Sequence, residues 1–414
     1  MKRLLILSAA LAVLLTACGK PDAHPVGGQV STVATTTTTA TTTATLIPTT
    51  TSTPTSTTTT STTASTTTTT TDRVTIDGVT YVGDAEAGLT ATDFELPLIG
   101  ATGFISVDTP LYGDSARTEL IATLKAGDAF TVQVEASADT WRVRTEDGTV
   151  GYVENTTCYL NIADVIPSIL LDNTNSYSSA FLSSGKPLPA ITGEKLYDAK
   201  RYNPRLGRDE FLVACNWQMV KKIYIAQQAA LAAGYTLVIN EAFRPMDVQL
   251  DIAATLKALY DTDPDVKAGI DTAPWNISWF IANRPSTHQM GCAIDTSLAK
   301  VTEITYRRCG DYRYREVTGF TLCGMPTPIH ELSAAAVSLS KPVNSYSATA
   351  WKSVSPAKSM TEDALKLKEF CTGAGMSPLA SEWWHFNDLA VKNAIGERYT
   401  TDPFYLDTCL SEIP

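Results

Sequence analysis

The chain has 414 residues, of which 44% are hydrophobic and 18% charged, and its formal net charge at pH 7 is −11. The acidic excess argues against a nucleic-acid partner, because such a partner requires a basic surface. The length leaves room for two folded domains after a non-globular N-terminal part.

Residues 1–18, MKRLLILSAALAVLLTAC, run from a basic pair through an apolar stretch that is too short to span a bilayer as a mature helix. This pattern predicts an export signal. Leu15, Thr16, Ala17 and Cys18 resemble the lipobox of bacterial lipoproteins. The resemblance implies cleavage before Cys18, lipidation of Cys18 and an extracytoplasmic, membrane-anchored protein. The alternative is an ordinary secretory peptide that is cut nearby.

Residues 19–73 contain a run, 31–71, that is almost pure threonine with a few Ala, Ser and Pro residues. Such a segment buries too little apolar surface to offset the entropy lost on ordering. We therefore expect a disordered, solvated tether.

Residues 74–165 predict short strands separated by turns, with hairpin signals at Asp77-Gly78 and Asp147-Gly148. The segment ELIATLKAGDAFTVQVEASADTWRVRTEDGTVGYV resembles bacterial SH3-like domains, most clearly in its closing DGTVGYV. This resemblance implies an all-β barrel that binds peptidoglycan or its stem peptides. A spacer barrel that binds nothing is the alternative.

Residues 166–414 have a different pattern. CNWQMVKKIYIAQQAALAAGY carries apolar residues at helical spacing and ends at Gly234. TLVINEAF predicts a strand, and DVQLDIAATLKALYDT and EDALKLKEFCTGAGM predict two further helices. Strands and helices that do not alternate strictly predict an α+β domain with a largely antiparallel sheet.

Seven cysteines follow Cys18, and none has a CxxC spacing. In an exported protein they are candidates for disulfides. The plausible pairs are Cys309–Cys323, Cys371–Cys409 and Cys158–Cys215, with Cys292 left as a free thiol. The sequence alone does not determine the pairing.

Candidate metal ligands lie in STHQMGCAIDTSL, where His288 and Asp295 flank Gly291 and Ala293. This spacing allows a turn to lead into a strand and both side chains to face one point. Catalytic zinc takes three protein ligands and keeps one position open, and His385 would complete the set. Two nitrogens and one carboxylate oxygen suit a single zinc ion, although other first-row ions accept the same donors.

A candidate general base lies in SEWWHF, residues 381–386. If this segment is a strand, Glu382 and His385 point to opposite faces, so we expect Glu382 in the turn that enters the strand. The neighbouring aromatic residues would raise the pKa of its carboxyl group. The alternative is that the aromatics form core and Glu382 lies at the surface.

Arg244 follows the predicted strand in INEAFRPMDVQ. A buried arginine needs a negative partner. That partner is either a substrate carboxylate or oxyanion, or Asp247 or Glu241 in a structural salt bridge.

Three motifs in this order resemble the zinc D,D-peptidases, which include the vancomycin-resistance D-Ala-D-Ala dipeptidases and D,D-carboxypeptidases: Phe243-Arg244-Pro245, Ser286-x-His288-x-x-Gly291-x-Ala293-x-Asp295 and Glu382-Trp383-Trp384-His385. Further similarities are SYSSAFLSSGKPL, Met325-Pro326-Thr327 followed by HELS, and FYLDT. The resemblance covers 166–414 and implies a small α+β domain with a cleft across an antiparallel sheet.

The resemblance also implies a role for each matching residue. His288, Asp295 and His385 would hold zinc, Glu382 would be the general base and acid, and Arg244 would stabilise the oxyanion. Ser286 would help to hold the substrate carboxylate. Tyr177, His330 and Glu331 would be substrate contacts.

Two departures from the family pattern affect the substrate. His330 stands where the family has an acid for the substrate's amino group, so either Glu331 replaces that acid or the substrate has no free amine. The segment 301–324 is longer than the family pattern requires and is a candidate cap over the cleft.

We therefore expect zinc-dependent hydrolysis of D-alanyl-D-alanine bonds, by a dipeptidase in the first instance. A D,D-carboxypeptidase that acts on peptidoglycan stem peptides is the alternative. A cross-bridge amidase or endopeptidase and a non-catalytic wall-binding lipoprotein are further possibilities.

Overall fold

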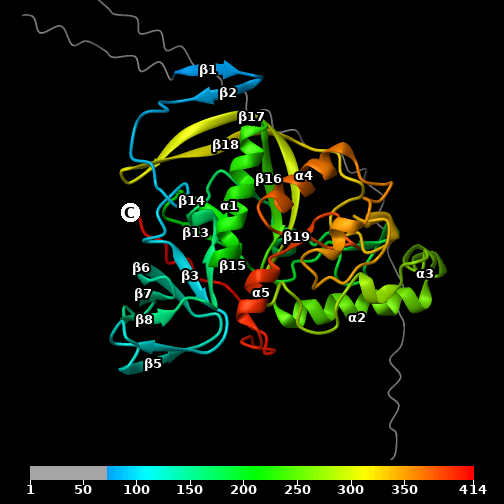
Figure 1. Ribbon diagram of the computed structural model, residues 1–414, viewed down its shortest axis with the longest axis horizontal. Coiled ribbons are helices and arrows are strands. Elements are labelled where there is room, and N and C mark those ends of the chain that lie inside the picture. Colours follow the sequence, from blue (N-terminus) through cyan, green and yellow to red (C-terminus); the bar gives the residue numbers. More distant parts are fainter. Residues whose placement is uncertain (1–71) are drawn as a thin grey trace, which may run out of the picture. The chain divides into compact units, whose positions relative to one another are not determined.

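The computed structural model describes residues 72–414, which fold into two eight-stranded sheets, two small hairpins and five α-helices (Figure 1). The architecture is mixed α and β, which agrees at that level with the predicted α+β class. The predicted lipoprotein signal with Cys18, and all but the end of the predicted tether, lie outside the described residues.

The first sheet is organised around β17 (Ala293–Cys309), the long central strand. β17 pairs antiparallel with β16 (Tyr235–Glu241), β18 (Tyr312–Leu322) and β20 (His385–Asn387). The remaining strands are β1 (Arg73–Ile76), β2 (Val79–Val82), β10 (Leu170–Leu171) and β19 (Ser377–Pro378). The sheet is therefore largely antiparallel, as predicted, and only the β2–β17 and β10–β16 pairs are parallel.

The register of this sheet positions the chemistry-bearing residues. Asp295 of β17 lies opposite His385 of β20 and also opposite Glu241 of β16. Side chains directly opposite each other in an antiparallel pair lie on the same face. Three separate parts of the sequence thus bring an imidazole and two carboxylates to one place.

The five helices are α1 (Trp217–Ala232), α2 (Met246–Thr262), α3 (Pro264–Ile270), α4 (Glu362–Gly373) and α5 (Leu389–Ile395). The three predicted helices are confirmed as α1, α2 and α4. Asn216 caps α1 by accepting a hydrogen bond from the Gln218 backbone N–H, and Gly234 follows the helix with φ +79°. None of the helices between residues 72 and 414 combines the length and apolarity that crossing a bilayer requires.

The second sheet has its eight strands in the order β15-β9-β3-β6-β7-β8-β4-β5. Its strands are β3 (Thr102–Ile105), β4 (Thr109–Tyr112), β5 (Leu120–Leu124), β6 (Ala129–Ser137), β7 (Thr140–Thr145), β8 (Val150–Glu154), β9 (Cys158–Asn161) and β15 (Ala214–Asn216). Two hairpins complete the fold: β11 (Leu182–Ser183) with β12 (Lys186–Pro187), and β13 (Lys200–Asn203) with β14 (Arg208–Phe211).

The two predicted regions exchange strands. β1 and β2 come from 74–165 in large part but join the sheet of β17, whereas β15 comes from 166–414 and joins the second sheet. One apolar core spans both regions, and in it Trp141 of β7 packs on Trp217 of α1 with ring centroids 5.2 Å apart. The division of the chain at 165/166 stays a prediction.

The seven cysteines of the described residues are free thiols. The expected Cys309–Cys323, Cys371–Cys409 and Cys158–Cys215 disulfides are therefore absent from this structure. For the first pair the reason is the β17–β18 register: Cys309 lies at the hairpin turn opposite Tyr312, whereas Cys323 follows Leu322, which lies opposite Ala299. The length of β17 between these positions is roughly 30 Å, far beyond the reach of a disulfide.

Candidate metal centre

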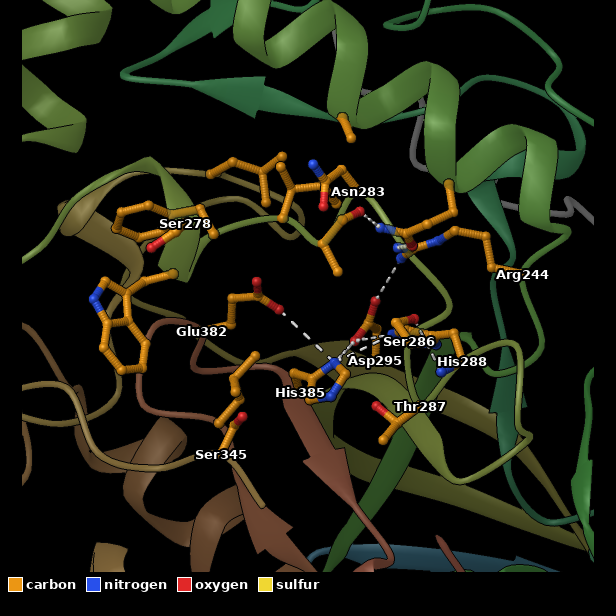
Figure 2. A pocket seen from close by; sticks show the side chains of 18 of the residues that line it. Arg244, Ser278, Asn283, Ser286, Thr287, His288, Asp295, Ser345, Glu382 and His385 are labelled. Carbon is orange, nitrogen blue, oxygen red and sulfur yellow. Dashed lines mark hydrogen bonds and ion pairs between the residues drawn. The ribbon is translucent and has the colours of Figure 1, made fainter. Parts of the chain in front are cut away.

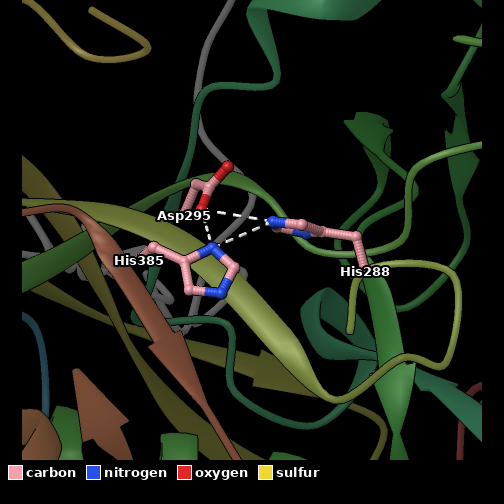
Figure 3. Close-up of side chains that lie close together, drawn as sticks. All are labelled: His288, Asp295 and His385. Atoms are coloured by element: carbon pink, nitrogen blue, oxygen red, sulfur yellow. Dashed lines mark hydrogen bonds and ion pairs between the residues drawn. The ribbon is translucent and has the colours of Figure 1, made fainter. Parts of the chain in front are cut away.

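Three predicted ligands form a small triangle at the start of β17 (Figure 3). His288 Nε2 lies 3.1 Å from His385 Nδ1, and Asp295 Oδ1 lies 3.3 Å and 2.9 Å from these two nitrogens. All three residues are buried. His288 reaches the site from the turn before β17, which passes through Gly291 at φ +61°.

Hydrogen bonds on the far side of each imidazole fix its tautomer. His288 Nδ1 donates to the Ala242 carbonyl over 2.6 Å, and His385 Nε2 donates to Asn387 Oδ1 over 3.0 Å. Since a neutral imidazole has one N–H, the nitrogens that face each other carry lone pairs. Two lone pairs and a carboxylate oxygen thus point at one buried place.

This arrangement fits a metal ion. Zinc–nitrogen and zinc–oxygen bonds of about 2.0–2.1 Å in a tetrahedron place neighbouring ligand atoms about 3.3 Å apart. The three observed separations, 2.9–3.3 Å, are close to that value. Without a cation the converging lone pairs would repel one another, so the site could bind a metal ion, and imidazole with carboxylate suits zinc and other first-row ions.

The charges around the site hold Asp295 ionised. Burial opposes ionisation of this carboxyl, but the neighbouring His288 side chain, followed by those of His330 and His385, keeps its pKa well below the ordinary value. Burial lowers the pKa of His288, which favours the neutral form that binds metals. For His385 burial also disfavours the charge, but the hydrogen bond that a protonated ring makes to Asp295 raises its pKa, so in the metal-free protein a proton on Nδ1 competes with a metal ion for this nitrogen.

Glu382 lies in the turn that precedes β20, the position that the sequence predicts. Its Oε2 is 3.8 Å from His385 Nδ1 (Figure 2). Burial, together with the negative charge of Asp295, raises the pKa of Glu382 to about 8, although His385 opposes the shift. A carboxyl group with a raised pKa beside a metal site is suited to accept and return a proton.

Arg244 is neutralised within the protein. Its guanidinium pairs with Glu241, donates to Gln249 Oε1 over 2.7 Å and lies 3.2 Å from Asp295 Oδ2. Burial opposes its charge, but Glu241 raises the pKa of Arg244 above its ordinary value. Of the two predicted alternatives, the salt bridge to Glu241 is present, and Asp247 instead accepts from the Tyr405 hydroxyl.

Glu241, Asp295 and His330 form a second buried group with metal-ligating atoms. Arg244 already places a cation between the two carboxylates of this group. A second metal ion there would meet the guanidinium at close range, so the group is better described as a cradle for Arg244.

A cleft of about 670 Å³ opens beside the triangle. Its walls come from 277–287 on one side and from Ser345 and Tyr346 on another, with Glu382, Arg244 and the three candidate ligands at its base (Figure 2). No lining residue belongs to 301–324, which instead forms part of the β17–β18 hairpin. The proposed cap therefore does not cover this cleft.

The structure brings some of the predicted substrate contacts to the cleft and leaves others away from it. Ser286 and His330 line the cleft. Tyr177 does not: it is half exposed, and its hydroxyl donates to Asp172 over 2.6 Å. Glu331 is buried and accepts from the backbone N–H groups of Ser184 and Gly185, which stabilises the β11–β12 turn.

Three supporting residues escaped the sequence reasoning: Asn387, Gln249 and Gln289. Asn387 follows His385 by two positions, so strand periodicity places both on one face and could have indicated it. Gln249 binds Arg244, and Gln289 Nε2 donates to the Arg244 carbonyl over 2.9 Å. No sequence signal distinguishes these glutamines from surface residues.

Comparison with protein-family models and with curated proteins finds no match to this chain.

Proposed function

We propose that the protein is a zinc-dependent hydrolase of D-alanyl-D-alanine peptide bonds. The observation that carries the proposal is the triangle of His288, Asp295 and His385, with Glu382 beside it at the cleft. A three-ligand site with room for water and a nearby base is the arrangement of catalytic rather than structural zinc. The motifs that resemble zinc D,D-peptidases supply the substrate class.

His288, Asp295 and His385 would hold the ion at the base of the cleft, where all three side chains are largely buried. When bound, zinc polarises a carbonyl oxygen and makes water a better acid. The hydrogen bonds to the Ala242 carbonyl and Asn387 orient the two imidazoles, as hydrogen-bond acceptors commonly do for metal-binding histidines.

Glu382 would take the proton from the attacking water and return it to the leaving amine. Its buried carboxyl lies 3.8 Å from His385 Nδ1 and lines the cleft, so it would be close enough to exchange a proton with a water beside these ligands. Arg244 would stabilise the oxyanion. A guanidinium has five N–H groups, and the four hydrogen bonds that Arg244 makes leave one N–H for substrate.

A second candidate within this activity is a D,D-carboxypeptidase acting on stem peptides. A free dipeptide carries an ammonium group that needs an acidic partner, yet among the described residues the only carboxylates lining the cleft are Asp295 and Glu382. Both already have other roles. The cleft volume, about 670 Å³, also lies in the range that holds ligands much larger than a dipeptide. These observations favour a longer substrate whose amine is acylated.

We further propose that 74–165 forms an SH3-like module that binds peptidoglycan, while a lipid on Cys18 attaches the protein to the membrane. Part of this module is covered by the C-terminal segment: Thr131 donates to the Leu410 carbonyl over 2.7 Å, and the Glu412 N–H donates to the Gly100 carbonyl over 2.7 Å. A wall ligand would therefore use another face.

The test uses the purified full-length chain loaded with zinc. It is incubated with D-Ala-D-Ala and, separately, with an N-acetylated peptide that ends in D-Ala-D-Ala, and released D-alanine is quantified. Release from the acetylated peptide alone identifies a carboxypeptidase, and release from the dipeptide identifies a dipeptidase. Zinc binding without release from either substrate would defeat the proposal and favour a cross-bridge hydrolase or a non-catalytic wall-binding protein.

A further inference from the structure

The loop 282–287 forms one wall of the cleft and is fixed at both ends. Gln249 Nε2 donates to the Ala282 carbonyl over 2.7 Å, and the Ser286 N–H donates to Gln289 Oε1 over 2.7 Å. Gln249 and Gln289 also bind Arg244. The two fixed ends therefore hold the intervening residues, including Arg284, in the wall of the cleft.

The hydroxyl of Ser286 already has partners. It donates its single proton to Gln289 Oε1 over 2.7 Å and accepts from the His288 N–H over 3.2 Å. Ser286 cannot donate to a substrate carboxylate without breaking its bond to Gln289. Binding of that carboxylate therefore requires another donor in the same part of the cleft.

The cleft contains three cationic side chains: Arg244, Lys257 and Arg284. Arg244 is neutralised by Glu241 and Asp295, and Lys257 pairs with Asp261. Arg284 is exposed, and within residues 72–414 its guanidinium makes no ion pair or hydrogen bond. Its neighbours in the loop, Asn283 and Ser286, both lie at the pocket in Figure 2.

We propose that Arg284 binds the terminal carboxylate of the peptide substrate. This inference rests on the proposed peptidase function and names its substrate class: peptides that end in a free α-carboxylate near the cleaved bond. A planar guanidinium matches a carboxylate in a bidentate pair. The enzyme would then cleave peptide bonds next to the free C-terminus of its substrate. It would not cleave bonds that have no free carboxylate beside them.

The test compares an N-acetylated peptide ending in D-Ala-D-Ala as the free acid and as the C-terminal amide. The zinc-loaded full-length chain should prefer the acid. Arg284→Gln should raise KM for the acid about 10- to 100-fold, because a charge-assisted pair is lost. It should leave kcat for the acid, and both KM and kcat for the amide, nearly unchanged. Arg284→Lys should restore part of the preference. The matched control, Lys257→Gln, removes the same charge from the same cleft and should keep the preference.

A binding measurement separates this inference from the proposed function. Calorimetry with zinc-loaded Glu382→Gln protein should show that the acid binds more tightly than the amide, and that adding Arg284→Gln abolishes the difference. If the wild-type protein hydrolyses acid and amide equally well, or Arg284→Gln keeps the preference, the role of Arg284 is refuted while the peptidase stands. If the wild-type protein hydrolyses neither and binds neither, both proposals fail.

Discussion

His330 donates a hydrogen bond from Nε2 to Oδ2 of Asp295 over 3.2 Å. Asp295 Oδ1 is the atom that faces His288 and His385, so His330 holds the carboxylate from behind. The His330 ring is fully buried and stacks on Phe181, with ring centroids 4.3 Å apart. It therefore acts on a candidate metal ligand more directly than on a substrate.

Replacing His330 should weaken metal binding. His330→Leu removes the donor to Asp295, and loss of such outer partners commonly lowers metal affinity about 10- to 100-fold. His330→Gln, whose amide can still donate, should retain most of the affinity. Chelator competition for zinc and the absorption spectrum of the cobalt-loaded protein measure the effect. Equal zinc affinity in the wild-type and leucine proteins would rule out this positioning role.

Removing the carboxyl of Glu382 should separate metal binding from turnover. Glu382→Ala should keep zinc, because Glu382 is not one of the three converging ligands, but should lower kcat about 10²- to 10⁴-fold. In the comparison variant His385→Ala, the zinc content itself should fall. Zinc per chain and released D-alanine are measured on the same samples. Unchanged turnover in Glu382→Ala would remove this residue from the role of base.

Local patterns in the sequence predicted the helices and the ligand set. α1 was identifiable from its apolar spacing and from the glycine after it, both of which act within a few residues. The candidate metal ligands were identifiable because their residue types and order are chemically restrictive. Asp295 and His385 then meet through a β17–β20 register that separate motifs cannot specify.

The pairing of strands that lie far apart in the sequence could not be predicted from the sequence. β2 aligns parallel to β17 over Thr80 to Val82, more than two hundred positions before its partner, and neither strand carries a signal for the other. The Cys309–Cys323 prediction failed for the same reason: cysteine spacing along a chain does not give the separation of the two residues in a sheet. The roles of Gln249 and Gln289 also depend on tertiary contacts alone.

In the metal-free protein the Glu382 carboxyl should contribute a loss of stability as pH rises from about 5 to 8. Glu382 has its pKa raised to about 8 in the fold, above its ordinary value of 4.5. As pH rises, the Glu382 carboxyl loses its proton at about pH 4.5 in the unfolded chain but keeps it up to about pH 8 in the folded protein. The stabilisation that this carboxyl gives below about pH 4.5 is therefore lost progressively up to about pH 8. We expect a decrease of a few kcal/mol in the free energy of unfolding. Urea titrations at several pH values measure it.

Two comparisons isolate the contribution of Glu382. Glu382→Gln cannot ionise, so this component of the pH dependence should disappear from its unfolding curves. Zinc should reduce the slope in the wild-type protein, because a nearby cation favours the carboxylate. An identical slope in the wild-type protein and in the Glu382→Gln variant would show that the carboxyl is not buried as described.

Arg205 should be essential for stability because it joins the C-terminal segment to the fold. Its guanidinium is buried and donates to the carbonyls of Pro97 and Asp164 over 2.7 Å and of Glu412 over 2.9 Å, with a further bond to Ile99. Arg205→Met leaves these carbonyls without their donor, and each buried unpaired group costs about 1–3 kcal/mol. We therefore expect the free energy of unfolding, measured by urea denaturation, to fall by about 3 kcal/mol or more.

Arg208→Met is the matched control for this prediction, because it removes the same charge and a similar volume from a half-exposed position. Arg208 itself is half-exposed, and Glu316 keeps a second ion pair with Arg307 when Arg208 is removed, so the loss should be about 1 kcal/mol or less. The urea midpoint of the Arg205→Met variant should therefore lie well below that of the control. Equal midpoints for the two variants would show that the C-terminal segment is not held by Arg205.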